Sequence, residues 1–260
     1  MSPRCTSFLL CLLPAAPGLF GQAMAADCLP AVQEVVHGDR AVAGDLFVAR
    51  DGRTVRLAGY IGGPGSKERL QQLVAGQKLG LRPLSRPLDR WGRTTAYVET
   101  SGTTPVPLAE VLIAEGLGHA AETGRPSCLD APLAAEARAR GAGLGIWSGS
   151  GTGIVSPADL DALTDQMGQH IVAEGRLASG RALRGRVYLN FARYWQSALS
   201  VVFSEADWAA MAPGVAPESL AGRRVRVRGW LEWRGGPSIQ PDPSEPVEPI
   251  DGRPLAAVER

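Results

Sequence analysis

The chain has 260 residues, of which 45% are apolar, and it carries 27 basic against 26 acidic side chains. This balance excludes a highly charged disordered chain, and a net charge near zero provides no general attraction for nucleic acid. The length suits one large domain or two small ones.

The first residues have the features of a secretory signal peptide. Arg4 precedes an apolar run that ends near Phe20, and Ala23-Met24-Ala25 is a small-x-small cleavage sequence. The run contains prolines and is shorter than a membrane span, which disfavours the alternative of a membrane anchor. We therefore expect residues 1–25 to be removed, no transmembrane segment, and a protein that is periplasmic or secreted.

Cysteines and histidines are few. If the signal peptide is removed, Cys28 and Cys128 are left, and in an oxidising compartment two cysteines most simply form one disulfide. Two separate buried thiols are the alternative. His37, His119 and His170 are widely separated in the sequence, so we expect neither a metal cluster nor a catalytic triad.

Small, flexible residues over 148–153 interrupt the patterned sequence and indicate a domain boundary. The predicted organisation is a signal peptide (1–25), a first domain (26–148), a linker with a short helix (149–167), a second domain (168–240) and a proline-rich acidic tail (241–260).

The first domain starts with strand-like segments, of which two flank Asp51-Gly52, a strong hairpin signal. Helical spacing follows later in the domain, and this arrangement is typical of the α+β class. The expected strands cover 41–49, 54–60, 78–84 and 94–99, and the expected helices begin near Ser66, Leu108 and Ala131.

The second domain shows a short helix from Ser156 and then mostly alternating strand patterns. The expected strands cover 169–177, 187–191, 199–203, 223–230 and 233–240, with a helix over 205–211. Five strands with one helix are typical of a small OB-type barrel.

Five motifs of the first domain, in their order and spacing, resemble the thermonuclease family, whose type member is staphylococcal nuclease. They lie at 44–45, 51–59, 89–93, 108–120 and 145–147. The resemblance implies a mainly β, α+β domain, in which a five-stranded OB-type barrel packs with helices. It also implies calcium-assisted cleavage of DNA and RNA phosphodiesters.

The resemblance carries three site residues over directly. Asp45 falls on a calcium-ligand aspartate, and Arg56 and Arg93 fall on the two arginines that hold the scissile phosphate. Oxygen ligands suit calcium and guanidinium forks suit phosphate. Trp91, beside Arg93, is either a platform for base stacking or a packing residue.

Two acids of the family pattern are missing. Ile61 stands where the resemblance places the second calcium carboxylate, and Pro64 stands where it places the general-base glutamate. Neither side chain can bind a cation or accept a proton. Glu68 is the nearest replacement base, although an acid at this position ordinarily compensates the positive end of the following helix, which is the favoured role.

The second domain resembles the small OB-fold module that follows the nuclease-like domain in some exported bacterial proteins. Strand alternation places Arg224, Arg226 and Arg228 on one face, opposite Val225 and Val227. This row is either a groove for single-stranded DNA or RNA or an ordinary solvated strand face.

The preferred hypothesis is an exported thermonuclease-like protein that binds nucleic-acid phosphates and has impaired catalysis, with calcium binding doubtful. One alternative is an active calcium-dependent nuclease that uses Glu68 or another acid as base. Another is an envelope protein that interacts with partners other than nucleic acid. The sequence gives no oligomeric state.

Overall fold

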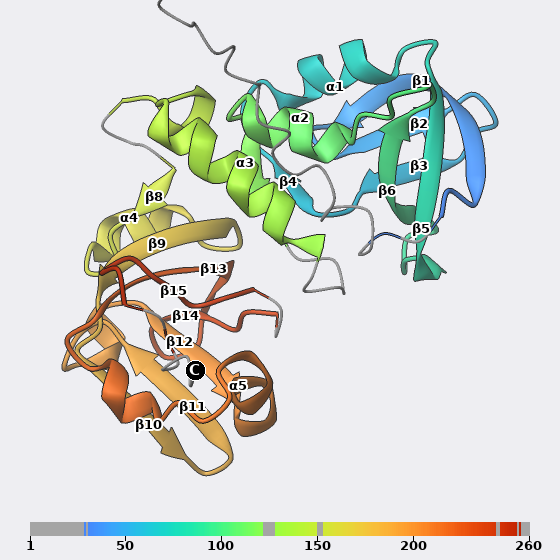
Figure 1. Ribbon diagram of the computed structural model, residues 1–260. Helices are drawn as coiled ribbons and strands as arrows, with labels where there is room; N and C mark the ends of the chain where they lie inside the picture. The colour runs from blue at the N-terminus through green and yellow to red at the C-terminus, as the bar shows by residue number, and fades with distance from the viewer. Residues whose placement is uncertain are drawn as a thin grey trace, which may run out of the picture.

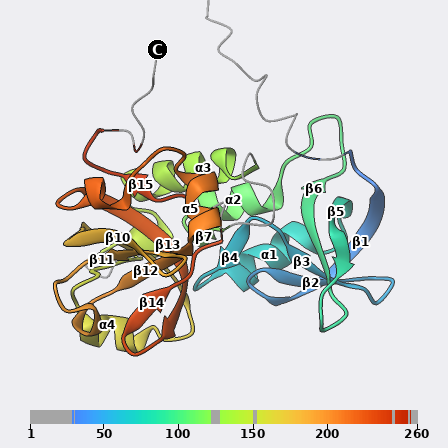
Figure 2. The same cartoon turned by 90° about the horizontal axis from the view of Figure 1, so that it is seen from below.

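The computed structural model describes residues 29, 31–121, 128–149, 153–242, 245–253 and 255. The predicted signal peptide and Cys28 lie outside these residues. Two lobes lie side by side, one formed by the first half of the chain and one by the second (Figure 1 and Figure 2). No helix in the described part of the chain is long and apolar enough to cross a membrane.

The first lobe is built on a closed barrel, as predicted. Five strands close it in the order β1-β2-β3-β6-β5, with β3 and β6 parallel and the other neighbours antiparallel. The strands are β1 (Glu34–Ala43), β2 (Leu46–Ala49), β3 (Thr54–Leu57), β5 (Lys78–Leu88) and β6 (Thr94–Thr100). The Asp51-Gly52 hairpin is confirmed, because Gly52 has a φ of 87° between the antiparallel strands β2 and β3.

Three helices and a small sheet accompany the barrel. The helices are α1 (Ser66–Val74), α2 (Leu108–Ala114) and α3 (Asp130–Gly141). Strands β4 (Tyr60–Gly62) and β7 (Gly118–Ala120) form a separate antiparallel pair. Leu70 of α1 and Leu112 of α2 are fully buried in the core that the helices share with the barrel.

Two expected strands of this domain are each broken by a turn. The segment 41–49 turns at Gly44-Asp45, between β1 and β2. The segment 54–60 turns at Ala58-Gly59, where Gly59 has a φ of 78°, and the chain then leaves the barrel as β4. A positive φ is easily adopted by glycine and ends an extended run.

The second lobe contains one eight-stranded sheet. Seven of its strands follow the order β10-β11-β12-β14-β13-β9-β8, and the eighth, β15, pairs with β13. Its strands are β8 (Ile154–Val155), β9 (His170–Arg176), β10 (Ser179–Leu183), β11 (Arg186–Asn190), β12 (Ser200–Ser204), β13 (Arg224–Trp233), β14 (Pro237–Ile239) and β15 (Glu248–Pro249). Its helices are α4 (Leu160–Asp165) and α5 (Glu205–Met211), each with a side-chain N-cap.

In this order β10 is at one edge of the sheet, and β9 is next to the strand β8 at the other edge. Only two residues separate β9 from β10 along the chain. The order is compatible with an OB-like barrel, which stays a prediction. The expected strand over 233–240 is wrong at its start, because β13 continues to Trp233 and Gly235-Gly236 form the turn before β14.

The described part of the predicted tail packs against the second domain. Glu248 pairs with Arg226 of β13 through β15, and Glu245 is buried. Asp251 forms an ion pair with Arg223 at 2.8 Å. The described tail residues therefore contact the second domain, and the predicted domain end at residue 240 stays a prediction.

Candidate nucleic-acid interface

Asp45 and Arg56 meet at the rim of the barrel. The guanidinium Nε of Arg56, on β3, donates to Asp45 Oδ2 at 2.9 Å, and both side chains are partly exposed. Asp45 lies in the turn before β2, and Leu46 is directly opposite Arg56 in the ladder. The carboxylate therefore fixes the direction of the guanidinium, and it is itself already engaged by a positive charge.

The loop between β5 and β6 holds the second arginine and the tryptophan. Asp89 accepts hydrogen bonds from the backbone N–H groups of Trp91 and Arg93, and from Arg93 Nε at 2.6 Å. The indole of Trp91 is 61% exposed. The guanidinium carbons of Arg90 and Arg93 lie 3.9 and 4.4 Å from its ring centroid. Such contacts with an exposed ring each contribute about 0.5–1 kcal/mol.

The register of β3 and β6 brings the two predicted phosphate arginines to one end of the same strand pair. Arg56 is opposite Thr95, and Arg93 comes directly before β6. Guanidinium groups on neighbouring strands can contact the same polyanionic backbone. The arrangement thus offers two cations and one exposed aromatic ring on one surface.

The segment that lacks the acids is tightly packed. A Cβ at Gly62 would lie 2.8 Å from backbone atoms of Gly44, and one at Gly63 would lie 3.0 Å from Ile146. A side chain at Gly62 would therefore require the backbone to move, whereas one at Gly63 would require the Ile146 side chain to shift. Glu68 is exposed in the first turn of α1 and is not among the residues that line the cavity beside Arg56.

The donor set near Arg56 does not fit calcium. Calcium takes 6–8 oxygen ligands and usually several carboxylates, typically about 2.3–2.6 Å away. Here Asp45 is bound to Arg56, and Ile61 has no donor atom. Among the described residues, no cluster of three or more histidine, cysteine or acidic side chains could hold a metal ion.

A cavity of about 550 Å³ lies beside Arg56, between the two domains. The barrel side contributes Arg56, Ile61 and Thr95, and the second domain contributes both charged and aromatic side chains. These are His170, Trp230, Gln240, Asp242 and Glu245. Acids are thus present near Arg56, but they come from the second domain.

Two histidines that are far apart in the sequence meet at this junction. The rings of His119 and His170 are 5.8 Å apart, centroid to centroid. His170 Nε2 is 2.9 Å from Glu245 Oε1, and both side chains are buried. Burial, followed by the charges of His170 and Arg228, lowers the pKa of His119 to about 4.

The predicted arginine row is not a solvent-facing strand face. Arg228 is 1% exposed and binds both Glu136 of α3 and Glu248 of β15. Arg226 is held by Glu174 and Glu248. Alternation is right in placing these side chains on one face, but that face packs against acids of α3, β9 and β15. Among the three arginines of the predicted row, all of which the structure describes, only Arg224 is exposed.

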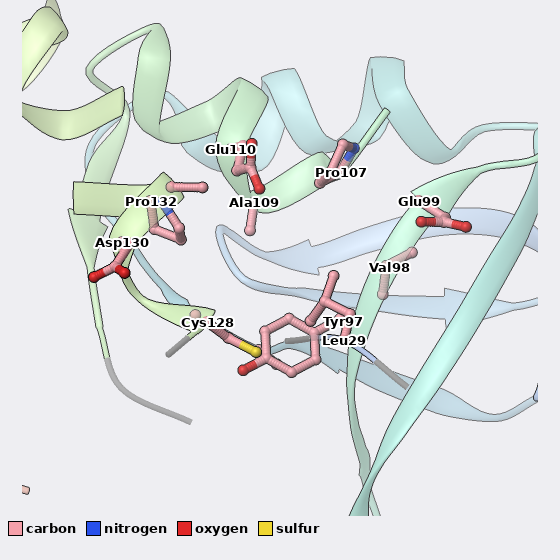
Figure 3. Close-up of a pocket in the computed structure, with 13 residues that line it drawn as sticks. Leu29, Tyr97, Val98, Glu99, Pro107, Ala109, Glu110, Cys128, Asp130 and Pro132 are labelled. Carbon is pink, nitrogen blue, oxygen red and sulfur yellow. The ribbon is translucent and has the colours of Figure 1, made fainter. Parts of the chain in front are cut away.

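Cys128, one of the two cysteines of the predicted disulfide, lies at a second cavity. Cys128 is buried and lines a cavity of about 330 Å³ together with Leu29, beside the ring of Tyr97 (Figure 3). Cys28 lies outside the described residues, so the pairing stays a prediction. The lining includes Glu99, Glu110 and Asp130, and none of the described lining residues is basic. The cavity is therefore unsuited to phosphate.

The first lobe thus belongs to the class of closed five-stranded barrels that pack with helices, and Arg56 lies at the rim of this barrel. Residues 62–149 match the model of the staphylococcal nuclease homologue family, so the chain carries a domain of that family. The matched segment includes Arg93 and begins after Asp45 and Arg56. No curated protein matches the chain. Such a domain indicates nuclease or nucleic-acid-binding function.

The sequence interpretation missed the groups that the second domain places beside Arg56. Trp230 and Glu245 are more than a hundred residues from Arg56, and no local pattern connects them. The tail was expected to be separate from the second domain, whereas its Glu245 is buried in the structure.

Proposed function

We propose that this protein is exported and binds nucleic-acid phosphates through Arg56 and Arg93, with phosphodiester cleavage impaired. One observation carries the proposal: the Asp45 carboxylate is bound to Arg56, while Ile61 and Pro64 occupy the positions of the missing acids. The site keeps the groups that bind phosphate and lacks those that hold calcium or activate water.

Binding is supported by the hydrogen-bonding capacity of the two arginines. Each donates its Nε to an aspartate, at 2.9 Å for Arg56 and 2.6 Å for Arg93. Terminal guanidinium N–H groups form short, charge-assisted bonds to phosphate oxygens. The exposed Trp91 ring adds a surface on which a base can stack.

Weak cleavage follows from the chemistry of general bases. A positioned base contributes about 10²–10⁴-fold to a hydrolysis rate. Glu68 is the alternative base, and its exposed place in the first turn of α1 keeps an active calcium-dependent nuclease as the second candidate function. In that case Glu68 must reach the phosphate held by the two arginines.

The deciding experiment incubates the mature, oxidised protein with single-stranded DNA and RNA, with calcium or with a chelator. Arg93→Ala and Glu68→Gln are compared with Arg40→Ala, which removes a surface arginine outside the site. We expect no cutting, and salt-sensitive binding that Arg93→Ala weakens.

Calcium-dependent cutting that both Arg93→Ala and Glu68→Gln abolish would overturn the proposal in favour of the nuclease. Absence of binding at every salt concentration would instead favour an envelope protein with other partners. Export rests on residues 1–25, and the mature N-terminus of protein recovered from outside the cytoplasm would test it. An intact Met1 would contradict it.

A further inference from the structure

A second basic surface lies on the outer face of the second domain. A cavity of about 360 Å³ is lined by strands β10, β11, β12 and β14 and by the loop before β12. We call it the β-face pocket and define it by Arg181, Arg186, Tyr188, Trp195, Arg234 and Ser238. Its size falls in the range of pockets that hold one small ligand, about 300–1,000 Å³.

The strand register gathers these side chains on one face. Arg181 is directly opposite Tyr188, and Tyr188 is directly opposite Val202. The alternate residues of β11, Val187 and Leu189, are buried in the core. Side chains directly opposite on antiparallel strands have Cβ atoms about 4.5–5.5 Å apart. Arg181 therefore lies beside the Tyr188 ring.

Charge distinguishes the β-face pocket from the other two cavities. The cavity at Cys128 is lined by acids, and the cavity beside Arg56 has charges of both signs. The β-face pocket has three arginines, and no acid is among the described residues that line it. Arg181 and Arg186 are exposed and form no ion pair with any described residue. Arg234 pairs with Glu232, but both side chains are about half exposed, so this pair is weak.

The aromatic side chain at the edge of the pocket is held in place. Trp195 is 46% exposed, and its indole lies against the Gly235-Gly236 turn. A Cβ at Gly235 would lie 2.7 Å from the indole, so a larger residue there would displace the ring. A fixed, half-exposed ring is a suitable platform for a base, because less side-chain freedom is lost on stacking.

The floor of the pocket is polar. Ser200 donates to Asn190 Oδ1 at 2.9 Å, and Asn190 Nδ2 donates to Ser179 at 3.2 Å. Ser238, directly opposite Ser200, is 4% exposed, and its hydroxyl has no hydrogen-bond partner among the described residues. A buried hydroxyl without a partner is unfavourable, and a polar ligand group that reached it would remove that cost.

We propose that the β-face pocket binds one nucleotide of a single-stranded nucleic acid, whose strand continues past Gln240 to the cavity beside Arg56. Arg181 and Arg186 bind the phosphates on either side of this nucleotide, Tyr188 and Trp195 stack on its base, and the serines face the edge of that base. Gln240 lines both cavities, so the two are adjacent. The continuation rests on the proposed function, whereas the pocket itself does not.

Acidic polysaccharides are the competing class, because arginines and aromatic rings also suit them. Nucleic acid is favoured because the neighbouring cavity is lined in part by the domain that matches the staphylococcal nuclease homologue family. A double-stranded ligand is disfavoured, because its bases are paired and cannot stack on side chains.

The test is fluorescence anisotropy with labelled oligodeoxythymidine and the full mature chain. Arg181→Ala/Arg186→Ala is compared with Arg40→Ala/Arg50→Ala, which removes the same charge from two exposed positions outside the three cavities. We expect the first pair alone to weaken binding and to make the slope of log K against log salt shallower by about 1.4, about 0.7 per lost phosphate contact.

Stacking is tested separately with Trp195→Ala, for which we expect binding about tenfold weaker. Its matched control is Tyr194→Ala, which removes a neighbouring ring that is 71% exposed and does not line the pocket. Trp195→Phe should restore most of the affinity because it keeps a ring. Thermal unfolding of each variant separates a loss of folding from a loss of binding.

Each remaining outcome decides between the two sites. If Arg93→Ala weakens DNA binding and the pocket variants do not, the pocket proposal is wrong and the proposed function stands. If only the pocket variants weaken it, the pocket stands and the phosphate site of the first domain fails. Pocket variants that lose heparin binding while DNA binding is unchanged would assign the pocket to a polysaccharide and overturn our proposal.

Discussion

Arg228→Met tests whether the buried ion pair couples the two domains. The Arg228 guanidinium binds Glu136 through both terminal nitrogens, at 3.0 and 3.1 Å, and also the carbonyl of Ala120 at 3.0 Å. Glu136 is fully buried. Burial raises the pKa of the Glu136 carboxyl, but Arg228 outweighs this effect and the pKa is lowered overall. Methionine leaves that carboxylate without its main partner.

Removal of one partner from a buried ion pair costs about 3–5 kcal/mol. We therefore expect Arg228→Met to lower the free energy of unfolding by about that amount. Urea unfolding followed by tryptophan fluorescence measures it. Trp147 lies at the junction, whereas Trp208 is buried in the second domain, so separated transitions would report uncoupled domains.

Two further variants make the experiment specific. Arg224→Met changes the exposed arginine of the same strand and should cost less than about 0.5 kcal/mol. Arg228→Met/Glu136→Gln removes the stranded charge and should recover part of the loss, because a buried pair can be replaced by neutral groups at little net cost. If Arg228→Met is no more destabilising than Arg224→Met, the ion pair does not hold the junction.

Three more predictions concern the junction, the disulfide and the metal. The folded-state pKa of His119, about 4, lies below its ordinary 6.5, so its stabilising effect is complete above about pH 6.5 and is lost as the pH falls. The unfolding free energy of the wild-type protein should fall by about 2 kcal/mol between about pH 7 and pH 5, and that of His119→Gln should fall by less. An equal fall in both proteins would contradict this prediction. Alkylation without reductant should leave Cys128 unmodified in denatured mature protein, and modification there would exclude the disulfide. Calcium should not raise the Tm of the wild-type protein. Ile61→Asp adds a carboxylate beside Arg56 and should make the Tm depend on calcium. A calcium-induced rise in the Tm of the wild-type protein would contradict our account of the donor set.

The barrel of the first domain could be predicted because its signals are local or fall in a recognisable order. Asp51-Gly52 marks a hairpin, and Gly116 ends the segment after α2 with a φ of 72°. The turns at Gly44-Asp45 and Gly59 were missed because glycine is also compatible with an extended strand. A positive φ is visible only once the strands are paired.

The site could be predicted only on the barrel side. Arg56, Arg93 and Asp45 were placed by motif spacing, and the structure brings Asp45 to Arg56. The wide sequence separation of the histidines gave no sign that His119 and His170 lie close together across the junction. Proximity of this kind depends on how two domains dock, and docking leaves no periodic pattern in either segment.

The arginines of the second domain differ in whether an acid pairs with them, and the sequence alone does not reveal this difference. Alternation assigns faces correctly, but the partner of each face lies far away: Glu136 is 92 residues from Arg228, and Glu174 is 52 residues from Arg226. These acids neutralise Arg226 and Arg228, which are partly and fully buried against them. Arg181 and Arg186 lie in the same domain, and no described acid forms an ion pair with them. Net positive charge therefore reaches solvent on β10 and β11, and a polyanion is expected to bind there and not on β13.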